Sequence, residues 1–229
     1  YMKRYIGIMF LLTNILWARS AMRLQQENLP RRILRKQSTT VSLEHGDLNG
    51  NLSCSMWNNG FIGDNTGYAL NYPSCWWPCD NLDVSKIVNS YLYMGGVWVG
   101  ARVPGDTIYE VARVENTEGF PSEFTPGYIS VKRPGDVAPI EVTVEYADTG
   151  VEYNFGKMLY VAVRSKSYEW LIKPCDNFFI TEYWIKNVGN EVLEKVYFGI
   201  YFDCDILTNA NGTGYAFNFC GADTARDLV

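Results

Sequence analysis

The chain has 229 residues, of which 47% are hydrophobic and 15% aromatic, and its formal net charge is −5. Residues 1–20 contain three basic side chains and no acidic one, so the remaining residues carry a net charge of −8. A body this acidic is a poor partner for nucleic acid or anionic lipid, because binding to either depends on neutralising phosphates with Lys and Arg.

The first twenty residues have the three parts of a secretory signal peptide. Met2, Lys3 and Arg4 form a basic start, residues 6–17 are mostly apolar, and Ala18-Arg19-Ser20 has the small-x-small pattern of a cleavage site. The apolar run is shorter than the roughly 20 residues that a membrane span needs. We therefore expect an exported bacterial protein, secreted or on the cell surface, with no membrane span after cleavage of the signal peptide.

The rest of the chain divides into a basic linker over residues 21–42 and a β-rich body over residues 43–229. The five basic side chains between Arg23 and Lys36 are typical of a solvated linker. The last residues, Leu228 and Val229, are an apolar pair that resembles the start of a strand. This ending predicts that the body is truncated at its C-terminus and belongs to a longer protein.

Alternation of apolar and polar residues dominates the body and favours strands over helices. In chain order, strands are expected at residues 52–57, 91–103, 107–114, 140–146, 159–168, 178–186, 192–202 and 215–219. Turn-forming residues at 104–106 and 187–190 predict that the flanking strands form hairpins, while residues 45–51 are expected to form a loop. The pattern predicts an all-β fold, an antiparallel β-sandwich that is immunoglobulin-like or larger, with little or no helix outside the signal peptide.

Two longer stretches carry a family resemblance. The first is Asn58–Asp64, followed by Tyr91–Val103 and Gly105–Thr107, and the second is Asn177–Asn190, continuing to Val196–Asp205. Together they resemble the N-terminal β-rich region of large, mostly uncharacterised secreted bacterial proteins, many of which end in a type IX secretion sorting domain. The resemblance implies a surface-attached or released protein and identifies no catalytic residue.

Cysteine content is consistent with an oxidising compartment. The six cysteines are Cys54, Cys75, Cys79, Cys175, Cys204 and Cys220. An even number in an exported chain indicates disulfides, although six cysteines allow 15 complete pairings. Cys75 with Cys79 would close a tight loop, and Cys204 with Cys220 would join two strands. The single histidine, His45, lies far along the chain from any cysteine pair, which argues against a zinc site.

Two features are candidates for ligand binding. The loop Cys75–Cys79 presents Trp76 and Trp77, whose rings could stack on the apolar faces of sugars. The simpler interpretation, which we favour, is that both rings cover the edge of the sandwich. Asp203 and Asp205 point to the same side of a strand end and are followed by oxygen-bearing side chains that suit Ca²⁺. The full candidate set for the metal is Asp203, Asp205, Asn209, Asn211 and Asp223. Ordinary turn chemistry explains these residues without any cofactor.

Evidence for catalysis is thin. No hydrolase or phosphate-binding motif is present, although a carboxylate pair for glycoside hydrolysis could occur among Glu123, Glu182, Asp203 and Asp205. Glu141 and Glu145 are expected to form a solvated strand face. We therefore predict a non-catalytic extracellular structural or binding module of a larger secreted protein, with an extracellular protein or polysaccharide as partner. The alternatives are a carbohydrate-binding module accessory to a hydrolase and, less simply, a β-sandwich glycosidase.

Overall fold

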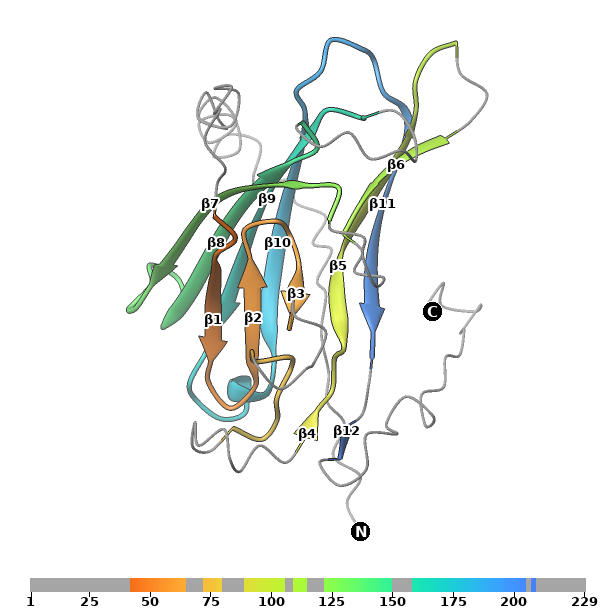
Figure 1. Ribbon diagram of the computed structural model, residues 1–229. Helices are drawn as coiled ribbons and strands as arrows, with labels where there is room; N and C mark the ends of the chain where they lie inside the picture. The colour runs from red at the N-terminus through yellow and green to blue at the C-terminus, as the bar shows by residue number, and fades with distance from the viewer. Residues whose placement is uncertain are drawn as a thin grey trace.

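The computed structural model describes residues 42–64, 72–79, 89–105, 109–114, 122–149, 158–204 and 207–208. Its strands form two main antiparallel sheets that lie face to face (Figure 1), which confirms the predicted all-β, sandwich-like fold. The helical element within these ranges is one turn of 3₁₀ helix, η2 (Cys175–Asn177). The expected signal peptide, the linker as far as residue 41 and the expected strand at 215–219 lie outside the described residues.

The first sheet is organised around one long strand, β5 (Met94–Arg102). Its order is β1 (His45–Asn49), β2 (Ser53–Trp57), β3 (Ile62–Gly63), β5 and β11 (Glu194–Asp203). A further strand, β6 (Tyr109–Arg113), pairs with β5 beyond the end of β3, as the predicted hairpin requires. A short separate ladder joins β4 (Asn89–Ser90) to β12 (Leu207–Thr208).

The second sheet is a meander in which each strand pairs with its neighbour in the sequence. It consists of β7 (Thr125–Lys132), β8 (Ile140–Ala147), β9 (Val161–Glu169) and β10 (Phe179–Asn187), in that spatial order. Side chains from both sheets fill the space between them. Each of the following is 2% exposed or less: Val97, Val99, Ala101, Val142, Val144 and Tyr146. The apolar alternation in the sequence therefore marks the inner faces of β5 and β8.

Two expectations about strands are wrong. β10 and β11 do not form a hairpin, because β10 pairs with β9 and β11 pairs with β5 in the opposite sheet. The connection between them is hydrogen-bonded to the residue before β9: the backbone N–H groups of Val188 and Gly189 both donate to the carbonyl of Tyr160. Residues 45–49 form β1 rather than a loop. In β1, Leu48 is buried, and a Cβ at Gly46 would lie only 2.6 Å from the side chain of Val131 in the other sheet.

One buried side chain, Asn58, connects the two sheets. Its Oδ1 accepts a hydrogen bond from the backbone of Glu44 at 3.0 Å, and its Nδ2 donates to the carbonyls of Ser42 and Gly127 at 3.0 and 3.1 Å. In return, the N–H of Gly127 in β7 donates to the Asn58 carbonyl at 2.8 Å. Asn58 thus holds the irregular start of β7, where the register with β8 shifts, against the end of β2.

Gly127 sits where two backbones approach too closely for any side chain. A Cβ there would lie 2.2 Å from the carbonyl oxygen of Glu145, whereas a Cβ at Gly199 in β11 would meet no atom within 4 Å. We predict that Gly127→Ala lowers the free energy of unfolding by about 2 kcal/mol, and that Gly199→Ala changes it by no more than about 0.5 kcal/mol. Urea unfolding of both variants measures this difference. Equal stability of the two variants would contradict the assigned contact.

Candidate functional site

The two adjacent tryptophans of the Cys75–Cys79 loop have different surroundings. Trp76 is 2% exposed, and its backbone exchanges two hydrogen bonds of 2.9 Å with Ser53 of β2. Trp76 also forms a bridge to Ser90 of β4, so it belongs to the interior. Trp77 is half-buried and reaches the surface. Of the two residues expected to meet a sugar, only Trp77 is placed to do so.

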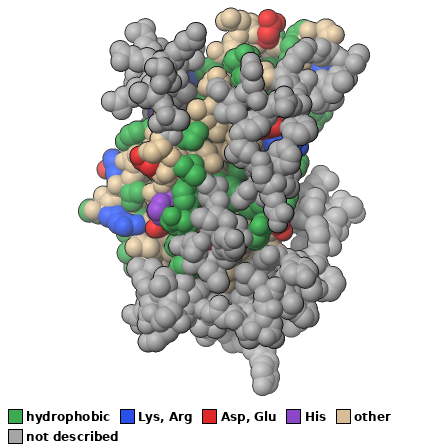
Figure 2. Space-filling model, in the orientation of Figure 1, with side chains coloured by type: hydrophobic (Ala, Val, Ile, Leu, Met, Phe, Trp, Pro, Cys, Tyr) green, Lys and Arg blue, Asp and Glu red, His purple; other side chains and the backbone are tan. Residues whose placement is uncertain are grey.

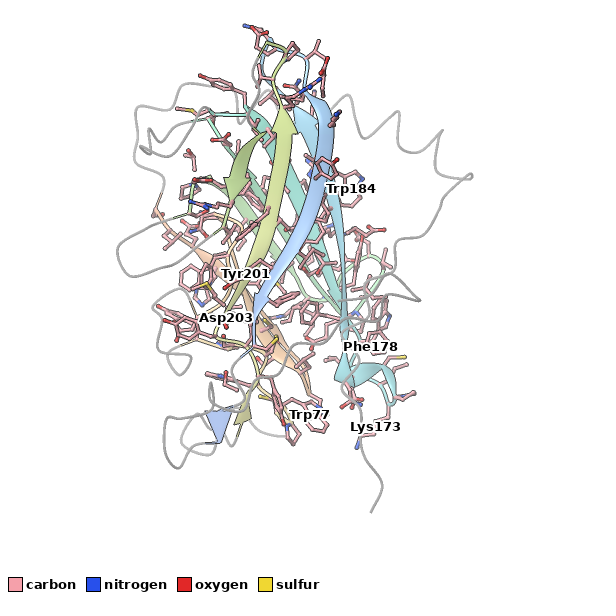
Figure 3. The ribbon with its side chains drawn as sticks, turned by 90° about the vertical axis from the view of Figure 1, so that its right-hand side faces the viewer. Trp77, Lys173, Phe178, Trp184, Tyr201 and Asp203 are labelled. Carbon is pink, nitrogen blue, oxygen red and sulfur yellow. The ribbon has the colours of Figure 1, made fainter. Side chains whose placement is uncertain are left out.

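Trp77 belongs to a network of side chains that we call the indole–amide cluster: Trp77, Asn51, Asp176 and Asn177. The Oδ1 of Asn177 accepts hydrogen bonds from Trp77 Nε1 and from Asn51 Nδ2, both at 2.8 Å. Asn177 Nδ2 donates in turn to Asp176 Oδ1 at 2.9 Å. These contacts join the β1–β2 turn of one sheet to η2, which precedes β10 in the other. Trp77 and Phe178 lie toward the same end of the molecule in Figure 3.

A buried carboxyl group lies next to this cluster. Glu169, at the end of β9, is fully buried, and its Oε2 accepts a hydrogen bond of 2.9 Å from the N–H of Gly50. Burial raises the pKa of Glu169 to about 7, although the Gly50 N–H and the charge of Arg133 oppose the shift. Two buried oxygens here, Glu169 Oε1 and Asn51 Oδ1, accept no hydrogen bond from the residues that the structure describes. A proton on Glu169 would turn one of these acceptors into a donor.

The indole–amide cluster offers an aromatic face, amide groups that donate and accept, and a carboxylate. Exposed apolar side chains flank it in the loop before η2, where Leu171 is 52% and Ile172 is 67% exposed. Such a set can hold a polar, uncharged ligand that also has apolar C–H surfaces. Nothing in the sequence pattern pointed to Asn51, Asp176 or Asn177, because their contact depends on how the two sheets meet.

The predicted calcium ligands are only partly within the described residues. Asp203 ends β11 opposite Met94, and its carbonyl accepts a hydrogen bond from the N–H of Tyr93 at 2.8 Å. Asp205, Asn209, Asn211 and Asp223 lie outside the described part of the chain, so their expected role stays a prediction. Among the residues that the structure describes, no group of three or more His, Cys, Asp or Glu side chains could hold a metal ion.

The cysteines show a contact that the sequence did not indicate. Cys75 Sγ lies 3.4 Å from Cys54 Sγ, whereas the expected partner, Cys79, uses its backbone N–H to bond the carbonyl of Asn51. Cys204 is exposed just after β11, and its expected partner Cys220 lies outside the described residues. No disulfide is formed among the cysteines within the described ranges.

The glutamates of β8 are not solvated, contrary to expectation. Glu141 is 1% exposed and lies 2.8 Å from Lys166 Nζ, and Glu145 is 6% exposed and accepts a hydrogen bond of 2.7 Å from Arg164 Nε. Burial by itself would raise the pKa of Glu141, but Lys166 and the backbone N–H groups of residues 136–138 lower it to about 2. β9 supplies the basic partner of each glutamate: Arg164 lies directly opposite Glu145, and Lys166 reaches Glu141 from the position opposite Thr143.

Two of the four carboxylates considered for glycoside hydrolysis, Glu182 and Glu123, have protein partners, and Asp205 lies outside the described residues. Glu182 accepts a hydrogen bond from the hydroxyl of Tyr168 at 2.7 Å. Glu123 accepts one from the backbone of Arg113 at 2.9 Å and lies 3.5 Å from its guanidinium group. These contacts give both glutamates a structural role, which accounts for them without catalysis.

A histidine, an aspartate and a serine come together on the outer face of the first sheet. His45 stacks on Trp57 with ring centroids 4.8 Å apart, and Figure 2 shows this only histidine at the surface beside hydrophobic side chains. Ser55 Oγ donates to Asp47 Oδ1 at 2.6 Å, and His45 Nε2 lies 3.6 Å from the same oxygen. The serine hydroxyl is directed at the carboxylate and not at the imidazole, so the order differs from that of a catalytic triad. This group was not foreseen, because β1 was expected to be a loop.

A second exposed surface lies along the connection of β10 to β11. Its large apolar side chains are between 37% and 67% exposed: Tyr160, Ile185, Val192, Val196, Tyr197 and Phe198. Among the described strands, β10 pairs with β9 and β11 pairs with β5. Exposed apolar side chains that lie together are common sites of contact with other chains.

Comparisons with known proteins identify no relative: no family model matches the chain, and neither does any curated protein or solved structure. Across the ranges that the structure describes, none of the helical structure is long and apolar enough to span a membrane.

The raised pKa of Glu169 predicts a specific pH dependence of stability. Because its pKa is about 7 when folded and 4.5 in the reference state, the folded chain binds the proton more tightly. The contribution of Glu169 to the free energy of unfolding is fully present below pH 4.5. It is lost as the pH rises through 7, and the free energy of unfolding falls by about 3 kcal/mol. Glu169→Gln, which stays uncharged, should lack this loss.

Urea unfolding between pH 4.5 and 8.5 tests the prediction, with Glu191→Gln as a control because Glu191 is exposed in the 188–193 loop. The control should follow the parent protein. Parallel stability curves for the parent and Glu169→Gln would show that the carboxyl group does not titrate in this way.

Proposed function

We propose that the chain is a non-catalytic extracellular binding module of a larger secreted or surface-attached protein, and that it binds polysaccharide at the indole–amide cluster. The proposal rests chiefly on one observation: Trp77 reaches the surface while its Nε1 is held by Asn177, which Asn51 also contacts. A ring fixed in this way loses little conformational freedom when a ligand binds.

Polysaccharide is the ligand class that best matches this chemistry. Pyranose rings have apolar C–H faces that can stack on an indole, and hydroxyl groups that can bond to amides and carboxylates. The net charge of −8 that remains without residues 1–20 favours neutral polymers over polyanions. The expected signal peptide supports an extracellular setting in which such polymers occur.

The electrostatics of the sheets support binding rather than hydrolysis. A glycosidase needs one carboxyl group that can donate a proton to the leaving oxygen. Glu141 is held ionised by Lys166, with a pKa of about 2. Glu169 has a raised pKa but is fully buried against the Gly50 N–H. Neither is suited to protonate a glycosidic oxygen.

A protein partner is the second candidate, and the exposed apolar side chains of β11 favour it. Val196 is 52% and Tyr197 is 61% exposed on this strand. Exposed apolar side chains that lie together are common sites of contact with other proteins. The two candidate functions use different surfaces, so a substitution of Trp77 distinguishes them.

Trp77→Ala tests the polysaccharide proposal. We predict that the purified chain is retained by at least one of cellulose, chitin, xylan and mannan, and that the substitution weakens this retention at least tenfold. The control is Trp98→Ala, because Trp98 is also half-buried but lies on β5, where it stacks on Tyr201 with ring centroids 5.3 Å apart. Retention is measured by pull-down on insoluble polymers and by affinity electrophoresis on soluble ones.

Equal retention of the parent and Trp77→Ala would place the binding elsewhere, and no retention on any of the four polymers would leave the protein-partner candidate in its place. Trp77→Phe adds a further check. It keeps a ring for stacking but removes the donor to Asn177, so it should retain more binding than Trp77→Ala.

Export of the chain is tested separately. Expressed with its own N-terminus in a Gram-negative host, the protein should reach the periplasm and begin near Ala21, as read by mass spectrometry of its N-terminal peptide. Replacing Leu11 and Leu12 by Arg interrupts the apolar run and should keep the full-length chain in the cytoplasm. Periplasmic protein with an uncleaved N-terminus, or cytoplasmic parent protein, would contradict the predicted signal peptide.

A further inference from the structure

Two buried sulfur atoms from separate segments are in contact. Cys54 lies in β2 and Cys75 lies 21 residues later, and their Sγ atoms are 3.4 Å apart. Cys54 is 0% and Cys75 is 1% exposed, so the contact is enclosed by the core. Both cysteines are reduced in the structure.

Backbone hydrogen bonds hold the two segments together at one side of the pair. Ser53 and Trp76 exchange both of their hydrogen bonds, each 2.9 Å long, in an isolated bridge. Beyond this bridge the pairing is irregular, because the N–H of Ser55 donates to the carbonyl of Pro73. The two sulfurs are nevertheless only 3.4 Å apart, and a disulfide needs them at about 2 Å.

The conformation of Cys75 indicates that its position is constrained. Its φ is 52°, in the left-handed region that few residues other than glycine adopt. Such a conformation persists where the surrounding contacts determine it, and here the bonds of Trp76 to Ser53 hold the following residue. Cys75 Sγ is thereby directed at Cys54.

We propose that Cys54 and Cys75 form a disulfide when the chain folds in an oxidising compartment. This pairing differs from the expected closure of the Cys75–Cys79 loop, because it would join β2 to the segment that carries Trp77 and so fix the indole–amide cluster from a second side. In the cell it rests on the proposed export, since cytosolic thiols are kept reduced.

The oxidant is a disulfide, either that of a thiol–disulfide oxidoreductase or oxidised glutathione. The thiolate of one cysteine attacks a sulfur of the oxidant, which forms a mixed disulfide and releases one oxidant thiolate. The thiolate of the other cysteine then attacks the protein sulfur of this mixed disulfide and releases the second. The protein loses two electrons, and the two thiol protons are taken up by the reduced oxidant.

Folding and oxidation are expected to occur together. In the folded protein, the neighbouring Cys54 thiol and burial raise the pKa of Cys75 well above its ordinary value. In the folded, reduced protein Cys75 is therefore poor in thiolate, and burial closes both cysteines to a bulky oxidant. The bond should form while the two segments are still opening and closing, and reduced protein that has already folded should oxidise much more slowly.

Peptide mapping identifies the pairing directly. The full chain is refolded with oxidised and reduced glutathione, or with dithiothreitol, then alkylated and cleaved before aspartate. Because aspartate occupies positions 47, 64 and 80, Cys54 falls in peptide 47–63, and Cys75 and Cys79 fall together in peptide 64–79. The Cys79→Ser variant leaves Cys75 as the only cysteine of the second peptide.

The expected result is that peptides 47–63 and 64–79 of Cys79→Ser are covalently joined after oxidative refolding and separate after dithiothreitol. Alkylated Cys54 and Cys75 in the oxidised sample would overturn the proposal. A parent protein in which Cys54 is alkylated and peptide 64–79 carries an internal disulfide would overturn it as well.

Thermal melting gives a second measurement. Oxidised Cys79→Ser should melt roughly 5–10 °C above its reduced form, while the Cys54→Ala, Cys75→Ala double variant should melt at the same temperature with and without reductant. An unchanged melting temperature of Cys79→Ser on reduction would count against the cross-link. Because the oxidant is added in vitro, this outcome does not depend on export or on polysaccharide binding. The disulfide proposal and the proposed function can therefore be refuted independently.

Discussion

The arrangement of the two sheets depends on the hydrogen bonds of Asn58. Its amide is fully buried, yet each of its polar atoms has a partner: the backbone of Glu44, the carbonyl of Ser42 and the carbonyl of Gly127. A buried amide with all its bonds made favours one arrangement, because any other packing leaves a donor or acceptor without a partner in a medium of low dielectric constant. Asn58 thereby favours the observed alignment of the start of β7 against the end of β2.

The indole–amide cluster is a consequence of that alignment. Asn51 comes from the β1–β2 turn of one sheet, and Asn177 comes from η2, which leads into the other. Neither residue could hold Trp77 in a single isolated sheet. The proposed binding surface is thus a property of the assembled sandwich, as ligand sites made by loops on a rigid scaffold often are. The exposed apolar side chains of β11 differ in kind, since they lie along a single strand.

Much of the fold could be predicted from the sequence. A strand with one buried face alternates apolar and polar residues, and this alternation can be recognised without knowing which strands pair with it. This holds for β5, β8 and β9, whose expected and observed ranges agree closely. The same reasoning failed for β1, where the inward position of Gly46 carries no apolar side chain. It also failed for the pairing of β10 with β11, because a turn signal at residues 187–190 shows that the chain bends there but not which sheet it enters next.

The site was less accessible to prediction for a related reason. Trp76 and Trp77 are adjacent and chemically alike, and only the bonds of Trp76 to Ser53 determine which ring is buried. The amides of Asn51 and Asn177 are 126 residues apart and belong to no motif. The burial of Glu141 and Glu145 likewise required the register with β9, which sets Arg164 beside Glu145. Contacts of this kind are determined by the three-dimensional arrangement and leave no local signature.

The central position of β5 has a consequence for the order in which the molecule can fold. Its partner β11 arrives late, since Arg102 and Glu194 pair although 92 residues separate them. The four strands of the other sheet all lie between these two and pair with sequence neighbours, so they can associate early and locally. Long-range pairings of this kind slow folding, because loop closure must precede the contacts that stabilise it. The first sheet therefore stays incomplete, with one side of β5 unpaired, until nearly the whole of the described chain has been synthesised.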